Sequence, residues 1–141
     1  METLKRVGHL NKLNSFQFLN PQIRFLCSSL SSLSLQGLPQ MIQLIFPRPV
    51  IPGSVSITFQ GGFVGTRCSI QFASPTSGEW EVVTRIFPED NNRLQSFALT
   101  PDSPNPLDAG VEKLKLVFEE SSDFFGRITI YDLRLEGHFP Q

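Results

Sequence analysis

The sequence predicts an all-β protein folded as an antiparallel β-sandwich, and three observations support this fold class. From residue 41 onward apolar residues recur at every second position, the period of strands that bury one face. Eleven Pro and ten Gly among 141 residues imply many chain reversals and argue against long helices. Seven short apolar runs follow one another at spacings of ~8–12 residues, a pattern typical of two packed sheets.

The first four predicted strands alternate between buried and exposed side chains. Residues 41–46 form the first strand, and a proline-rich break ending in the Pro52-Gly53 turn separates it from the second, residues 54–60. Gly61-Gly62 ends the second strand, and residues 68–72 form the third. The fourth strand, residues 80–87, is expected to turn these side chains inward: Trp80, Val82, Thr84 and Ile86.

The last three predicted strands are residues 94–99, 113–118 and 128–135. In the final strand Ile128 and Ile130 share one phase, whereas Leu133 and Leu135 share the other. A slip of one residue turns the following side chains to the opposite face unless a bulge absorbs it. We therefore expect a β-bulge near Tyr131-Asp132.

Residues 1–35 differ from the rest of the chain and are expected to form a divergent N-terminal extension to a domain spanning 36–141. Apolar residues three apart, from Leu10 to Leu19, predict a short amphipathic helix that ends at Asn20-Pro21. A Ser/Leu-rich run follows. The segment is basic and almost free of acids, as in a cleaved organellar leader, but a poorly ordered extension or a diverged first strand explains it as well.

Composition excludes several classes of function. A formal net charge of −1 provides no general attraction to nucleic acid or to anionic membranes. Two Cys cannot form a disulfide-dense scaffold, and no apolar stretch approaches the ~18 residues of a transmembrane helix. We accordingly expect neither direct nucleic-acid binding nor membrane insertion, and we expect a monomer.

Motifs for catalysis, cofactors and metals are also missing from the sequence. No nucleophile elbow, P-loop, Cys-x-x-Cys or dinucleotide-binding motif occurs. His9 and His138 lie near the chain ends without partners at ligand spacing, and Cys68 is expected to be a small buried apolar residue. The oxygen-rich run 89–92 fits no calcium-loop template and is expected to be a turn that satisfies its own backbone. We predict no enzyme activity, no cofactor and no metal site.

Adjacent aromatic residues mark a candidate interaction site at Phe124-Phe125-Gly126-Arg127. Neighbours on a strand point to opposite faces, so one ring is available as an exposed anchor, and aromatic and Arg residues dominate binding hot spots. The alternative interpretation, which we favour, is that both rings cap the open end of the sandwich while Arg127 pairs with Asp123 or Glu119. Phe63, after the double glycine, has the same two interpretations.

Four blocks of sequence, in order, resemble the nuclear receptor-associated repressor family, small proteins described as associating with the testicular orphan nuclear receptor. The resemblance covers about residues 36–137. It rests on Gln60-Gly61-Gly62-Phe63, on the run 87–97 beginning Phe87-Pro88-Glu89-Asp90-Asn91-Asn92, on Leu114 to Glu119, and on Asp123 to Leu133. The acidic, Trp-containing segment that family members carry before Gln36-Gly37 is replaced here by the Ser/Leu run.

The resemblance implies a galactose-binding-like (discoidin-like) jelly-roll sandwich without catalytic activity. It further implies a nuclear protein that restrains receptor-driven transcription by contacting an orphan nuclear receptor or another transcription factor. A carbohydrate-binding module is the alternative function, and a cytoplasmic or organellar location is the alternative to the nucleus. The candidate interaction rim comprises Phe63, Asn91, Asn92, Phe124, Phe125 and Arg127.

Overall fold

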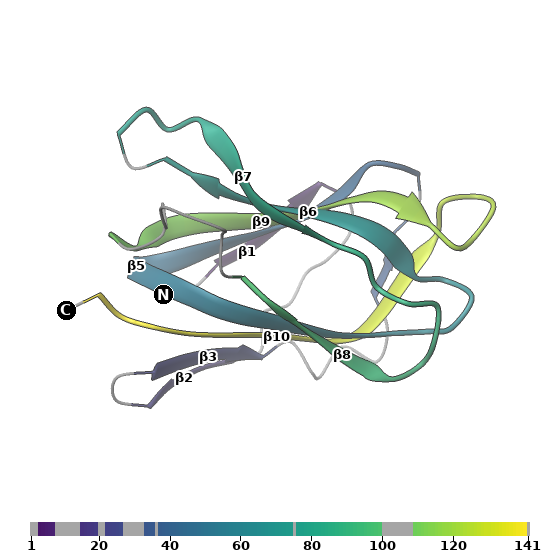
Figure 1. Ribbon diagram of the computed structural model, residues 1–141, viewed down its shortest axis with the longest axis horizontal. Coiled ribbons are helices and arrows are strands. Elements are labelled where there is room, and N and C mark those ends of the chain that lie inside the picture. Colours follow the sequence, from purple (N-terminus) through teal and green to yellow (C-terminus); the bar gives the residue numbers. More distant parts are fainter. Residues whose placement is uncertain are drawn as a thin grey trace.

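The structure is a computed structural model, and the residues it describes are built almost wholly from β-strands (Figure 1). It describes residues 37–74, 76–99 and 109–140, together with the strand backbones of 3–7, 15–19, 22–26 and 33–35. The strands, in chain order, are β1 (Thr3–Val7), β2 (Ser15–Leu19), β3 (Gln22–Leu26), β4 (Leu33–Leu35), β5 (Gln40–Phe59), β6 (Gly65–Ala73), β7 (Trp80–Ile86), β8 (Leu94–Ala98), β9 (Val111–Ser121) and β10 (Ile128–His138).

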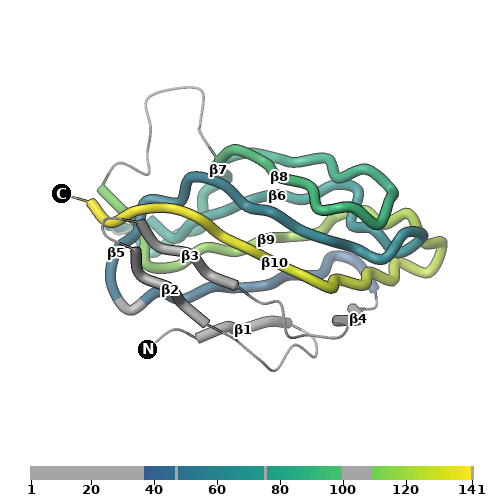
Figure 2. The backbone as a smooth tube through the Cα atoms, turned by 90° about the horizontal axis from the view of Figure 1, so that it is seen from below, coloured from purple at the N-terminus to yellow at the C-terminus, as the bar shows by residue number. Residues whose placement is uncertain are grey.

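The strands form two antiparallel sheets that face one another, which confirms the predicted sandwich (Figures 1 and 2). One sheet has the order β1-β5-β9-β6-β7. The other has the order β2-β3-β10-β5-β8, with β4 beside the first part of β10. β5 belongs to both sheets, so it connects the two layers along one strand. None of the described residues belongs to a helix long and apolar enough to cross a membrane.

The first two predicted strands are one continuous strand, which corrects the expected turn at Pro52-Gly53. The first half of β5 pairs with β9 as far as Ile45, and pairing resumes irregularly at Val50. The second half pairs with β10 and β8 instead. Proline has no N–H to donate to a ladder, and the prolines at 47, 49 and 52 lie where the strand leaves one sheet for the other. The prolines therefore mark a crossing between layers, not a reversal of the chain.

The predicted bulge in the last strand is present. Ile130 pairs with Phe59 while Asp132 pairs with the preceding Thr58, so Tyr131 is the extra residue. Tyr131 is exposed, and these apolar side chains on either side of it are all buried: Ile128, Ile130, Leu133 and Leu135. The bulge keeps both halves of β10 facing the core.

A second bulge, in β7, overturns one predicted inward side chain. Ile70 pairs with Thr84, and Gln71 pairs with Val82, so Val83 is the extra residue. Val83 packs against the core, whereas Val82 is 47% exposed. Val82 and Val83 are equally apolar, so the sequence does not show where the bulge lies. Strict alternation therefore predicted that Val82 faces the core, whereas Val83 does.

The core consists of apolar side chains from both sheets and contains no charged residue among the described positions. Phe59 and Phe118 are fully buried, with ring centroids 6.0 Å apart and planes at 84°. This edge-to-face contact joins the strand shared by the sheets to the centre of one sheet. Cys68 is a free thiol buried beside them, as predicted, and burial raises its pKa.

The first 35 residues contribute strand backbones to both sheets. β1 pairs with β5, while β3 and β4 pair with β10 and β2 pairs with β3. Residues 15–19 are strand, not the C-terminal part of the predicted helix, and residues 8–14 lie outside the described part of the chain. The division into an extension up to residue 35 and a domain from residue 36 stays a prediction.

Candidate functional site

The connections that carry the six predicted rim residues lie at one end of the sandwich, opposite the end where β10 finishes (Figure 1). Three connections meet there: residues 60–64 between β5 and β6, 87–93 between β7 and β8, and 122–127 between β9 and β10. Side chains of two of these connections hydrogen-bond to the backbone of the first. The connection 60–64 is therefore the centre of the rim.

The double glycine connects the first loop to the second. Gly61 N–H donates to Asn92 Oδ1 at 2.6 Å, and Gly62 N–H donates to Asp90 Oδ1 at 2.7 Å. Within its own loop Asn91 Oδ1 accepts the N–H of Arg93 at 2.9 Å. The predicted self-satisfying turn at 89–92 is thus confirmed for Asn91, and Asp90 and Asn92 also bridge to a neighbouring loop.

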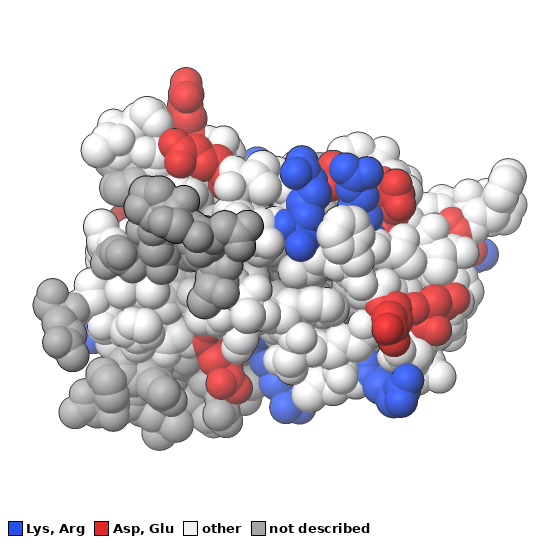
Figure 3. Space-filling model, in the orientation of Figure 1, with Lys and Arg blue, Asp and Glu red and all other residues white. Residues whose placement is uncertain are grey.

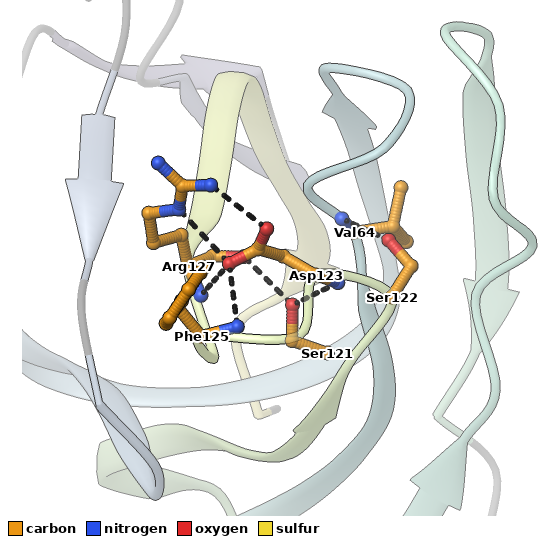
Figure 4. Close-up of polar contacts among 6 residues, drawn as sticks. All are labelled: Val64, Ser121, Ser122, Asp123, Phe125 and Arg127. Carbon is orange, nitrogen blue, oxygen red and sulfur yellow. Dashed lines mark hydrogen bonds and ion pairs between the residues drawn. The ribbon is translucent and has the colours of Figure 1, made fainter.

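The first loop is joined to the third by backbone and hydroxyl hydrogen bonds (Figure 4). Val64 N–H donates to Ser122 Oγ and Ser122 N–H donates to the Val64 carbonyl, each at 2.9 Å. The Phe63 carbonyl accepts the N–H of Thr129, also at 2.9 Å. These bonds fix the base of the 122–127 loop to the body of the sandwich.

Asp123 organises the third loop from the inside (Figure 4). Its Oδ2 accepts the backbone N–H groups of Phe125 and Arg127 at 3.0 Å and Arg127 Nε at 2.9 Å, while Oδ1 accepts Arg127 Nη2 at 3.0 Å. The bond from the Arg127 side chain is the main reason that the pKa of Asp123 falls to about 2, and the same bond raises the pKa of Arg127. Asp123 is one of the two partners, Asp123 or Glu119, that the sequence offered for Arg127.

Phe124 and Phe125 project into solvent, and this corrects the favoured interpretation that they cap the sandwich. Their side chains are 94% and 71% exposed, with ring centroids 5.2 Å apart and planes at 87°. The end of the core beneath them is already filled by Phe59, Val64, Phe118 and Ile128, all fully buried. The two rings are therefore not needed for packing, and the hydrogen bonds to Asp123 turn their loop outward.

Arg127 connects the aromatic residues of two loops. Its guanidinium lies 5.1 Å from the ring centroid of Phe63 and 5.5 Å from that of Phe125, within the range of cation–π attraction. Phe63 is half-buried beneath it. The structure thus brings Phe63, Phe125 and Arg127 together. Asn92 contacts the first loop at Gly61, and Asn91 bonds within its own loop.

Two apolar residues at this end were not among the predicted rim residues. Phe87, just after β7, is 64% exposed. In the predicted strand 80–87 it alternates with the inward-facing side chains, so the sequence could have predicted its exposure. Leu38 is 41% exposed, and its Cγ lies 3.2 Å from the position a Cβ on Gly126 would occupy. No pattern in the sequence marked Leu38, because its contact with Gly126 joins residues far apart in the chain.

The rim's polar side chains are used within the protein. Asp90, Asn92 and Asp123 accept N–H groups of this chain, and among the described residues no group of three or more His, Cys, Asp or Glu is placed to hold a metal ion. Glu119, at the nearby end of β9, lies 3.6 Å from Arg67 and 3.5 Å from Arg85. Such partly exposed pairs contribute little stability.

We expect the Asp123–Arg127 pair to make the free energy of unfolding depend on pH in the acidic range. A lowered folded-state pKa contributes stability above the ordinary value of 3.8, and that contribution disappears as the pH falls through about 2. The wild-type chain should therefore resist urea better than Asp123→Asn at neutral pH, and the difference should shrink below about pH 4. A difference that stays constant down to pH ~2 would show that the carboxylate's charge is not what stabilises the loop.

Comparison with known proteins gives relatives over most of the chain. The chain is 44% identical over 102 residues to a nuclear receptor 2C2-associated protein of Danio rerio, an alignment covering 72% of this chain and 67% of the relative. It is 36% identical over 136 residues to the protein of the same name from Homo sapiens, covering 96% of this chain and 92% of the relative. No protein-family model matches the chain.

Solved structures share the fold at low sequence identity. An F5/8 type C domain from Bacteroides fragilis superposes with a TM-score of 0.60 at 16% identity, covering 77% of this chain and 74% of that domain. The family 32 carbohydrate-binding module of Clostridium perfringens NanJ, solved with galactose, gives 0.58 at 17% identity and covers 96% and 93%. The fold is therefore the galactose-binding-like, discoidin-like sandwich.

Proposed function

The chain belongs to the nuclear receptor 2C2-associated protein family, and from this premise we propose that it is a non-enzymatic protein-interaction module that represses transcription driven by a nuclear receptor. It acts as a monomer in the nucleus, and its partner is nuclear receptor 2C2 or a related transcription factor. The family name supports association with a receptor. Repression and nuclear location are parts of the proposal.

The exposed aromatic pair on the rim is the observation that carries the proposal. Burying a Phe side chain stabilises a folded protein by ~1.5–3 kcal/mol. Phe124 and Phe125 are both exposed, so neither contributes this stabilisation to the fold. Aromatic rings beside an arginine are also the residues that dominate protein-binding hot spots. Contact with another protein explains both features.

The absence of catalysis is supported by how the rim's ionisable groups are used. Asp123 and Arg127 neutralise one another, and Asp90 accepts a backbone N–H. General acid–base work needs a group whose proton can be exchanged with a substrate near the working pH. The pKa of Asp123, about 2, leaves that carboxylate ionised and a poor base.

Binding of a carbohydrate is the second candidate, favoured by the likeness to a module solved with galactose. A sugar site needs polar groups beside an aromatic ring to bond the sugar hydroxyls. Asp123, which lies in the same loop as Phe124 and Phe125, already receives three N–H groups of this chain through Oδ2. The rim therefore suits an apolar protein surface better than a sugar.

The proposal is tested by calorimetric titration of the whole chain with purified nuclear receptor 2C2 and, separately, with galactose. We expect saturable binding of the receptor and no heat from galactose. A receptor-driven reporter gene, assayed in the nucleus of cells expressing the chain, should lose output. Binding of galactose without binding of the receptor would overturn the proposal in favour of a carbohydrate-binding module.

A further inference from the structure

We propose that Phe124 and Phe125 form a preformed aromatic knob that enters an apolar pocket of the partner, and that Arg127 pairs with a carboxylate at the edge of that pocket. The inference rests on the proposed function, and it adds which side of the contact is convex and what chemistry the partner supplies. The knob consists of the side chains of Phe124 and Phe125 only.

The shape of the knob is convex and apolar. The two rings are the most exposed large apolar side chains among the described residues, at 94% and 71%. They pack edge to face, so they present one combined surface. Figure 3 shows the tip of the molecule at this end as uncharged, with an acidic and a basic side chain behind it. A convex apolar tip buries its surface fully only in a concave apolar site.

The loop that carries the knob is held in place before any partner arrives. The Asp123 carboxylate accepts the backbone N–H groups of Phe125 and Arg127, and Ser121 Oγ donates to the Arg127 carbonyl at 2.7 Å. Ser122 fastens the loop to Val64. A contact surface ordered in advance loses less conformational entropy on binding, so more of the interaction energy appears as affinity.

The charge displayed beside the knob is positive. Asp123 and Arg127 form an ion pair, yet the carboxylate is only 10% exposed whereas the arginine side chain is 43% exposed. A partner that approaches the rings therefore meets the guanidinium, and its counter-ion lies underneath. Charge complementarity at the edge of the pocket calls for a carboxylate on the partner.

Affinity for purified nuclear receptor 2C2 tests the knob, measured with the full chain and the variants Phe124→Ala, Phe125→Ala and Val82→Ala. We expect each knob variant to bind more than about tenfold more weakly, because buried aromatic anchors dominate interfaces. Val82→Ala, which removes apolar atoms from a side chain that is 47% exposed within β7 and outside the three connections of the rim, should change affinity less than about twofold. Binding should also weaken as salt is raised, since the contact includes a charge pair.

The outcomes separate the two proposals. If the wild-type chain does not bind the receptor, the proposed function and the knob both fail. If it binds but the knob variants bind equally well, or if Val82→Ala weakens binding as much as they do, the proposed function stands and the knob is overturned. Unchanged thermal unfolding of the variants would show that lost affinity is not lost folding, as expected for side chains so exposed. With p-benzoylphenylalanine at position 124, crosslinks to a flat polar surface of the receptor would also contradict the pocket.

Discussion

Replacing Phe118 by alanine is expected to lower the free energy of unfolding by about 3–5 kcal/mol, the usual cost of removing a buried phenyl ring. Phe118 is fully buried in β9 and meets Phe59 of β5 edge to face, so the variant loses contacts with both sheets. Gly65 lies against the same ring, because a Cβ there would be 2.4 Å from Phe118 Cδ1. Equilibrium urea unfolding of the whole chain measures the loss.

Phe124→Ala is the matched control for this prediction. It removes the same atoms from a side chain that is 94% exposed, and surface changes of this kind usually alter stability by less than about 0.5 kcal/mol. Equal losses from the two variants would mean that the ring of Phe124 is buried, or that of Phe118 is not, and would contradict the assignment of core and rim.

Gly137→Ala is expected to give the next largest loss, about 1–3 kcal/mol or more, because overpacking here meets backbone atoms. An added Cβ would lie 2.4 Å from the Ile51 carbonyl oxygen and 3.0 Å from the Pro52 Cα. Neither atom can move aside by rotating a side chain. The site is also where the register between β10 and β5 shifts, so the clash falls on the strand that joins the sheets.

Gly53→Ala supplies the control, since Gly53 lies on the same pair of strands. Its added Cβ would approach the Glu136 carbonyl oxygen at 3.5 Å, an ordinary van der Waals contact. Thermal unfolding of both variants should show a lower Tm for Gly137→Ala and little change for Gly53→Ala. The reverse order would mean that β5 and β10 do not approach each other in this register.

The fold could be predicted from alternation because each strand buries one face only. Ile42 and Leu44 at one end of β5 and Val55 and Ile57 at the other are all buried, as their period of two predicts. The prolines between them led to the wrong prediction of a turn. A proline interrupts strand pairing, but the sequence does not show whether the chain then reverses or continues into another sheet. Here the chain continues into the second sheet.

One bulge was predictable and the other was not, for a physical reason. In β10 the polar Asp132 separates two apolar phases, so the slip is visible in the sequence. In β7 the extra residue is Val83, beside Val82, and a valine satisfies either face. Residues 15–19 of the predicted helix show a related effect: spacing of three favoured a helix, but pairing with a neighbouring strand decides the backbone.

The candidate site could be located from sequence, but its geometry could not. Adjacent Phe124 and Phe125 indicated a choice between capping and exposure, and only the fold shows that Phe59, Val64 and Phe118 already fill that end. The sequence left Asp123 and Glu119 as alternative partners for Arg127, and the structure shows the pair with Asp123. The hydrogen bonds from Gly61 and Gly62 to Asn92 and Asp90 join loops about 30 residues apart, so no local sequence pattern could predict them.

Amide hydrogen exchange of the whole chain, with and without nuclear receptor 2C2, would show whether the rim that carries the knob is the surface that binds the receptor. We predict slower exchange on binding in the connections 60–64 and 122–127, with little change around Trp80 at the other end of the sandwich. Protection confined to that other end, or to the outer faces of the sheets, would contradict the account.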